Sequence, residues 1–110
     1  MSASRRKGTR WETAIADFLR ANGFPGAERR ALAGAADRGD IAGVPEVCIE
    51  AKCARAIELA SWADEARAEA ANAGAGIAAV WVHRRGRSSP ADGYVVLDGA
   101  TFAAMLRRMR

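Results

Sequence analysis

The chain is short, basic and of ordinary globular composition. Its 110 residues are the usual size of one domain, and 50% hydrophobic with 27% charged residues is not the composition of a disordered chain. No apolar run approaches the ~20 residues of a membrane-spanning helix, and the Arg-rich residues 2–7 lack the apolar stretch of a signal peptide. We therefore expect one domain over residues 1–110 with no membrane partner, in which residues 1–8 form a flexible basic arm.

The few cysteine and histidine residues limit the metal chemistry and the compartment. Cys48 and Cys53 lie too close along one expected strand for a convincing disulfide, and two cysteines with one histidine do not make a zinc site. A reduced protein of the cytoplasm, or of the host cytoplasm if the gene is viral, fits best. His83 ends an apolar run, which is more typical of a surface or core-edge residue than of a general base.

Positive charge gathers in three clusters along a chain of net charge +4 and pI ≈ 9.8. Such clusters are expected in a protein that binds a polyanion, most simply nucleic acid. The alternative is that they are solvated ends and a basic loop. The clusters consist of Arg5, Arg6, Lys7 and Arg10, then Arg84, Arg85 and Arg87, and finally Arg107, Arg108 and Arg110.

In chain order, the first half predicts a helix followed by three strands. Thr9 and Glu12 form a capping-box pattern before apolar residues at helical spacing, and the helix should end near Asn22 and Gly23. A loop of small residues is expected at 33–39 and a turn at 43–45. Strands are expected at residues 27–32, 40–42 and 47–53.

The second half predicts a helix, two strands and a closing helix. Ser61 and Asp64 form a second capping box, which opens an alanine-rich helix that stops at Gly74. The continuous apolar run 77–82 is typical of a buried strand. A basic turn at 84–92, a strand at 94–97 and a helix at 101–109 follow. Because a helix between the third and fourth strands implies a crossover, we expect an α/β fold with a mixed central sheet of about five strands flanked by helices.

Three ionisable residues lie where a half-buried sheet disfavours them. Glu50 and Lys52 are two apart on one strand, so their side chains project from the same face, and Asp40 begins the neighbouring strand. Carboxylates suit a hard cation such as Mg²⁺, which polarises a phosphoryl oxygen and acidifies its bound water, while a lysine stabilises charge at the phosphorus. The structural alternative is a salt bridge of Glu50 with Lys52 or an arginine, and a turn at Asp40.

Four short motifs in the first half of the chain extend this pattern. They are Arg6-Lys7-Gly8-Thr9-Arg10-Trp11-Glu12, Asn22-Gly23-Phe24, Gly39-Asp40-Ile41-Ala42 and Ile49-Glu50-Ala51-Lys52. Together they resemble the archaeal and phage Holliday junction resolvases of the PD-(D/E)xK nuclease superfamily. The likeness continues weakly through residues 80–86, so it covers most of the chain.

The resemblance implies a restriction-endonuclease-like core, Mg²⁺ or Mn²⁺ as cofactor, and a homodimer that cuts opposite strands of a four-way DNA junction. Its catalytic residues map to Glu12, Asp40, Glu50 and Lys52. Its metal ligands map to Asp40, Glu50 and the backbone carbonyl of Ala51, with Glu12 as a further candidate. The arginine of its first strand maps to Arg30 or Arg29, which join the first two basic clusters as expected DNA contacts.

Two details of this mapping leave alternatives open. The family carries a serine in the loop before the aspartate, whereas residues 33–36 offer no hydroxyl, so that substrate contact has no counterpart here. Glu12 lies at the edge of the helix's apolar stripe and could face the site, or it could only close the Thr9 capping box.

Other functions fit parts of the same pattern. A restriction-like or repair endonuclease would act on duplex DNA, an inactive DNA-binding module would keep the fold without the chemistry, and a structural subunit would serve a larger complex. The presence of Asp40, Glu50 and Lys52 together argues against an inactive module, because a dead site has no reason to keep three polar groups that are costly to bury.

Overall fold

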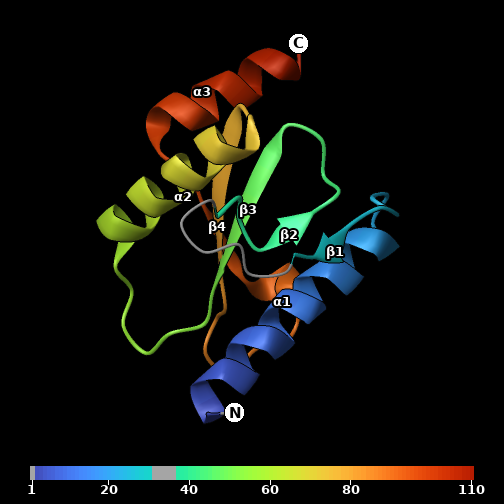
Figure 1. The fold of residues 1–110 in the computed structure, drawn as a ribbon, viewed down its shortest axis with the longest axis vertical. Helices are drawn as coiled ribbons and strands as arrows, with labels where there is room; N and C mark the ends of the chain where they lie inside the picture. The colour runs from blue at the N-terminus through green and yellow to red at the C-terminus, as the bar shows by residue number, and fades with distance from the viewer. Residues whose placement is uncertain (1, 31–36) are drawn as a thin grey trace.

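The computed structural model describes residues 2–30 and 37–110, and these form an α/β fold in which three helices flank a five-stranded sheet (Figure 1). The strands are β1 (Glu28–Arg29), β2 (Ile41–Ala42), β3 (Val47–Lys52), β4 (Ile77–Val82) and β5 (Tyr94–Val96). The helices are α1 (Ala3–Ala21), α2 (Leu59–Ala73) and α3 (Gly99–Arg108), with a short 3-10 helix, η2 (Pro90–Asp92), before β5.

The sheet is mixed, as the sequence predicted. Its strand order is β1-β2-β3-β4-β5, and β3 pairs with β4 in parallel while the other three pairs are antiparallel. The parallel pair is joined through α2, which is the crossover expected between the third and fourth strands. The α/β class with a mixed sheet and flanking helices is therefore confirmed.

Helix α1 begins much earlier than the sequence predicted. Its first turn is capped by Ser2, whose hydroxyl accepts a hydrogen bond from the backbone N–H of Arg5 at 3.1 Å. Thr9 consequently lies inside the helix, and the predicted capping box of Thr9 and Glu12 is wrong. Residues 3–8, expected to be a flexible arm, form the first turns of α1 instead.

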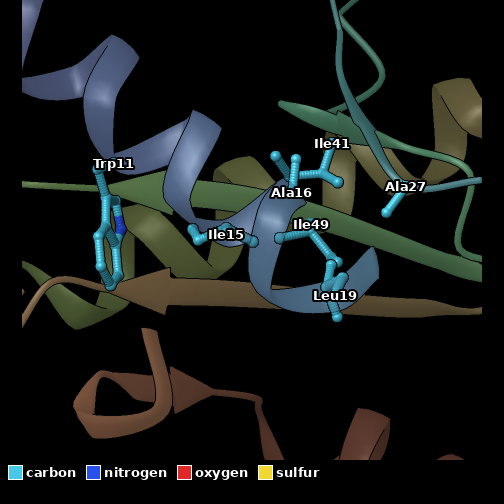
Figure 2. Close-up of a cluster of buried hydrophobic side chains, with 7 residues drawn as sticks. All are labelled: Trp11, Ile15, Ala16, Leu19, Ala27, Ile41 and Ile49. Atoms are coloured by element: carbon cyan, nitrogen blue, oxygen red, sulfur yellow. The ribbon is translucent and has the colours of Figure 1, made fainter. Parts of the chain in front are cut away.

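One apolar cluster joins α1 to the sheet. Trp11, Ile15, Ala16 and Leu19 of α1 are buried, and Figure 2 shows their side chains directed at the strands. Their partners across the interface are Ala27, Ile41 and Ile49. The indole N–H of Trp11 also donates to the backbone carbonyl of Trp81 at 3.0 Å, which ties the helix to β4.

The opposite face of the sheet is covered by α2 and α3 (Figure 1). In a second cluster, Trp62, Ala66 and Ala70 of α2 pack against the inner strands at Cys48, Ala78, Val80 and Val82. Helix α2 begins at Leu59 after Glu58, and the Ser61 hydroxyl donates to the Glu58 carbonyl at 3.3 Å, so the second predicted capping box is also wrong. Gly74 ends α2 in the left-handed conformation with φ 67°, as predicted.

The remaining comparisons with the sequence predictions concern strand length, the two cysteines and membrane-spanning helices. The strand expected at 27–32 is limited to Glu28–Arg29 in the described residues, and residues 31–36 of the expected strand and loop lie outside them. Cys48 and Cys53 are both free, as predicted. Within residues 2–30 and 37–110, none of the helices combines the length and the hydropathy that crossing a bilayer requires.

Substitutions of Gly8 test whether residues 3–8 are helical, as the structure shows. A methyl group added at Gly8 would meet no atom within 4 Å, so Gly8→Ala should raise the free energy of unfolding by ~0.5–1 kcal/mol through helix propensity alone. Gly8→Pro should lower it by ~3 kcal/mol, because proline removes a helix hydrogen bond and clashes with the preceding turn. Urea unfolding followed by circular dichroism measures both changes. Equal stability of both variants and the wild type would mean that residues 3–8 are not helical.

Candidate functional site

Gly39 fixes the position of Asp40 against β3. Its φ is 93°, and a Cβ there would lie 2.8 Å from the Cys48 sulfur and 3.0 Å from the Ile49 carbonyl oxygen, so only glycine fits. This close approach allows the backbone N–H of Asp40 to donate to the Ile49 carbonyl at 2.8 Å. The carboxylate of Asp40 in turn accepts a hydrogen bond from the Ala51 N–H at 2.8 Å, just beyond the end of the β2–β3 pairing.

Asp40 and Glu50 lie on the same face of the sheet. Ile41 pairs with Ile49, and both pack toward α1, so the residues before and after this pair point toward α2. Glu50 is only 4% exposed. Burial raises the pKa of Glu50 far above its usual range, and hydrogen bonds to the carboxyls of Asp40 and Glu69 raise it further. The environment of Glu50 therefore favours the protonated form of its carboxyl group.

Lys52 follows Glu50 on this face, at the last position of β3. Its ammonium group lies 3.2 Å from a carboxylate oxygen of Glu65 on α2 and 5.9 Å from the centre of the Trp62 ring. Burial alone would lower the pKa of Lys52, but the negative charges of Glu50, Glu65 and Asp40 outweigh it and the pKa is raised. The ammonium group is therefore charged, and its electrostatic partners include both predicted carboxylate ligands.

The structure thus brings Asp40, Glu50 and Lys52 to one place, and it adds two acidic residues that the sequence analysis missed. Asp37 precedes β2, and Glu69 lies on α2 and is 4% exposed. Burial raises the pKa of Glu69 to about 7. A signal for Glu69 was present in the sequence, because it lies three residues after Ala66 and seven after Trp62, on the apolar face of α2.

The carbonyl of Ala51, a predicted metal ligand, lies on the open side of β3. Since the Ala51 N–H donates to Asp40 on the β2 side, the carbonyl of the same residue faces that side as well. The neighbouring Lys52 carbonyl faces the other way and accepts from the His83 N–H at 2.8 Å. The carbonyl of Ala51 therefore lies on the same edge of β3 as the carboxylate of Asp40.

Glu12 lies apart from this group, in an ion pair across α1 and β1. Its carboxylate accepts a hydrogen bond from Arg29 at 2.7 Å. Burial raises the pKa of Glu12; the hydrogen bond to Arg29 opposes this, and the charge of Asp40 adds to it. Glu12 is therefore close enough to Asp40 for the two charges to interact, but its carboxylate is paired with Arg29.

The guanidinium of Arg30 has a buried Nε atom without a hydrogen-bond partner in the described residues.

A basic cleft of about 720 Å³ opens at the carboxyl ends of β3 and β4. The residues that line the cleft include Cys53, immediately after Lys52, and His83, immediately after β4. His83 also packs edge-on against the Trp11 ring with centroids 4.9 Å apart, as expected for a core-edge residue. The positively charged side chains that line the cleft are those of Lys7, Arg55, Arg84 and Arg85.

Of the other predicted DNA-binding residues, Arg5, Arg6, Arg10 and Arg87 lie on segments that border this cleft, whereas Arg29 and Arg30 lie at β1, on the other edge of the sheet. Arg5 and Arg10 are exposed on α1, as is Arg6, and Arg10 also lines a smaller hollow of about 300 Å³ beside Lys7 and His83. Arg87 lies 3.8 Å from Asp92. The first two basic clusters thus meet across the α1–β4 junction, although they are far apart in the sequence.

No protein-family model, curated protein or solved structure matches the chain. The arrangement of its own residues therefore carries the functional argument. The donor set of Asp40, Glu50 and the Ala51 carbonyl consists of oxygen atoms, which is the set that a hard divalent cation such as Mg²⁺ or Mn²⁺ requires. The residues present fit such an ion.

The buried carboxyls predict an unusual dependence of stability on pH in metal-free solution. Because the folded state keeps protons that the unfolded chain loses above about pH 4.5, the free energy of unfolding should fall as pH rises from 4.5 to 7. Each extra proton contributes at most ~1.4 kcal/mol per pH unit. Urea unfolding at pH 5, 6 and 7 with a chelator measures this slope.

Two variants distinguish the contribution of the buried carboxyls to this pH dependence of stability from that of the exposed carboxyls. Glu50→Gln should remove at least one proton's share of the slope, whereas Glu58→Gln, at an exposed position before α2, should leave it unchanged. A wild-type slope that persists in Glu50→Gln would show that Glu50 is ionised in the folded protein.

Proposed function

We propose that this protein is a metal-dependent DNA endonuclease of the PD-(D/E)xK type that resolves four-way junctions. The observation that carries the proposal is the convergence of Asp40, Glu50 and Lys52 on one sheet face, where the Ala51 N–H holds the Asp40 carboxylate and the charges of Asp40 and Glu50 act on Lys52. The restriction-endonuclease-like character of the core is part of the proposal, supported by the mixed sheet and by a carboxylate donor set at the β2–β3 edge.

Each residue has a defined part in the proposed hydrolysis. Asp40, Glu50 and the carbonyl of Ala51 hold the cation, and the hydrogen bond from the Ala51 N–H keeps the Asp40 carboxylate in place. When bound, Mg²⁺ or Mn²⁺ polarises the phosphoryl oxygen and makes a bound water more acidic. Lys52, held over Trp62 by Glu65, provides a fixed positive charge where negative charge develops at the phosphorus. Glu12 holds Arg29 in an ion pair, close enough to Asp40 for the two carboxylates to influence each other.

The basic cleft supplies the proposed DNA interface. It begins one residue after Lys52, so a backbone phosphate bound there lies along the same strand end as the carboxylates. Lys7, Arg84 and Arg85 contact phosphates from this cleft, and Arg5, Arg6, Arg10 and Arg87 extend the positive surface. Phosphate contacts of this kind are independent of base sequence, which suits recognition by branched shape.

Cutting both strands of a junction requires a second active site, so we propose a homodimer. Helix α3 and its C-cap residue present an exposed apolar row that a second copy can cover, formed by Phe102, Leu106 and Met109. Sedimentation should then give about twice the 11.6 kDa of one chain. The same proposal places the protein in the cytoplasm, or the host cytoplasm if the gene is viral, which cell fractionation tests.

A panel of matched four-way, forked and linear DNA tests the activity. With Mg²⁺ we expect paired nicks in the four-way substrate at a rate well above that on linear duplex. Selective cutting of linear duplex would instead indicate a restriction-like or repair enzyme. Metal-independent binding without nicking, even with Mn²⁺, would indicate an inactive DNA-binding module.

Lys52→Ala should abolish cleavage while leaving the affinity for the junction within about threefold, because one charge beside the phosphorus is lost and the cleft remains. Gel-shift and nicking assays on the same preparation measure the two properties. Asp40→Asn is the matched metal-site variant and should also lose cleavage. Equal loss of binding and cleavage in Lys52→Ala would make Lys52 a structural residue.

Binding should weaken steeply with salt, because each phosphate contact releases counterions. Replacing both Arg84 and Arg85 by alanine should reduce the slope of log affinity against log salt by about 1.8, at ~0.9 per contact. The control variant, Arg107→Ala with Arg110→Ala, removes the same charge from exposed positions of the third basic cluster. A slope that falls equally in both double variants would assign binding to net charge and not to the cleft.

A further inference from the structure

The acidic residues that the sequence analysis missed form a compact group with Glu50 between the sheet and α2. Asp37, Glu50 and Glu69 each contribute one carboxylate oxygen, and these three oxygens lie within 4.8 Å of one another. The three residues come from the segment before β2, from β3 and from α2. The group therefore spans three parts of the chain that no local sequence pattern connects.

An unsatisfied atom distinguishes this group from an ordinary acidic surface. Glu69 is 4% exposed, and its Oε2 atom is buried without a hydrogen-bond partner in the described residues. A buried carboxylate oxygen without a partner loses its hydration and gains nothing in return, which costs folding free energy. Such an atom, next to two further carboxylates, is explained by a ligand that the protein is built to bind.

The nearby cations do not neutralise the group. Lys52 is paired with Glu65 at 3.2 Å, one helical turn before Glu69. Among the described residues, no ion pair joins a basic side chain to Asp37, Glu50 or Glu69 within 4.0 Å. The three carboxyl groups thus lie together at a buried point without a basic side chain paired to them.

The backbone around the group is held in place from both sides. The Asp37 carboxylate accepts from the Gly39 N–H at 2.9 Å, and its carbonyl accepts from the side chain of Asn72 on α2 at 2.8 Å. The tie between Asn72 and Asp37 fixes the segment before β2 to the helix that carries Glu69. The Asp37 carboxylate and the segment that carries it are therefore positioned before a ligand arrives, which lowers the entropic cost of binding.

We propose that Asp37, Glu50 and Glu69 are joint ligands of a divalent cation bound between β3 and α2. The three donor atoms are oxygens, and no cysteine or histidine belongs to the group, so the ion is a hard cation such as Mg²⁺ or Mn²⁺. Three carboxylates leave coordination positions for water or a phosphate oxygen. Because Glu69 is on α2, the ion fastens this helix to the sheet.

This cation is a second one beside the cation that the proposed function assigns to Asp40, Glu50 and the Ala51 carbonyl, and Glu50 is shared between the two sites. Its catalytic use rests on the proposed function, but its binding does not. Ion binding should stabilise the folded protein even without DNA, since the unfolded chain does not assemble the three carboxylates. Binding of the ion and cutting of DNA can therefore be measured separately, on the full chain.

The test is titration of the metal-free protein with Mn²⁺ alone, by calorimetry and by thermal unfolding. The wild type should bind and gain thermal stability. Glu69→Gln should lose at least tenfold in Mn²⁺ affinity, and Asp64→Asn, which removes one charge from an exposed position of α2, should stay within threefold. Metal-free Glu69→Gln should melt at the wild-type temperature or above it, because a neutral amide costs less to bury than a carboxylate without a partner. If Glu69 were merely structural, the substitution would lower the melting temperature.

The outcomes separate this inference from the proposed function. Unchanged Mn²⁺ affinity in Glu69→Gln, in a wild type that cuts junctions, overturns the inference and leaves the nuclease intact. Mn²⁺ binding that depends on Glu69, in a wild type that cuts no DNA, supports the inference and overturns the nuclease. A wild type that does not bind Mn²⁺ overturns both.

Discussion

The burial of the polar face of β3 against α2 is the constraint on which the rest of the structure depends. One face of this strand is apolar and packs on α1, but the other carries Glu50 and Lys52 under a helix. Ionised groups in such a position cost folding free energy unless they are protonated, paired or coordinated. The protein pairs Lys52 with Glu65 and leaves Glu50 against Glu69, so of these two glutamates of α2 only Glu65 has a basic partner.

The crossover topology turns this constraint into a site. Since β3 and β4 are parallel, their carboxyl ends lie at one edge of the sheet, where the basic cleft opens. Helix α2 returns in the opposite direction, which sets Glu65 beside Lys52 and Glu69 beside Glu50. Groups able to hold a cation and groups able to hold an anion thus occupy neighbouring parts of the same strand end, which is the arrangement on which the proposed phosphodiester hydrolysis relies.

Long elements were easier to predict than their ends. The apolar run at 77–82 and the alternation at 47–52 gave β4 and β3 correctly, because burial on both faces or on one face dictates those patterns. Both capping boxes were wrong. The pattern at Thr9 is local, and it is overridden because Ser2 caps the helix and residues 3–8 continue it without conflict. The same holds for Ser61, which lies within the first turn of a helix that begins at Leu59.

By itself, the sequence determined that Glu50 and Lys52 share a face, since the side chains of a strand alternate with a period of two. It also determined that Asp40 follows a glycine, the residue type that tolerates the φ of 93° found at position 39. Only the tertiary structure decided that Asp37 and Glu69 join Glu50 and that Glu12 is engaged by Arg29. These contacts connect residues that are 13 to 32 positions apart in the sequence. Their strength depends on burial, which arises only when the helices pack on the sheet.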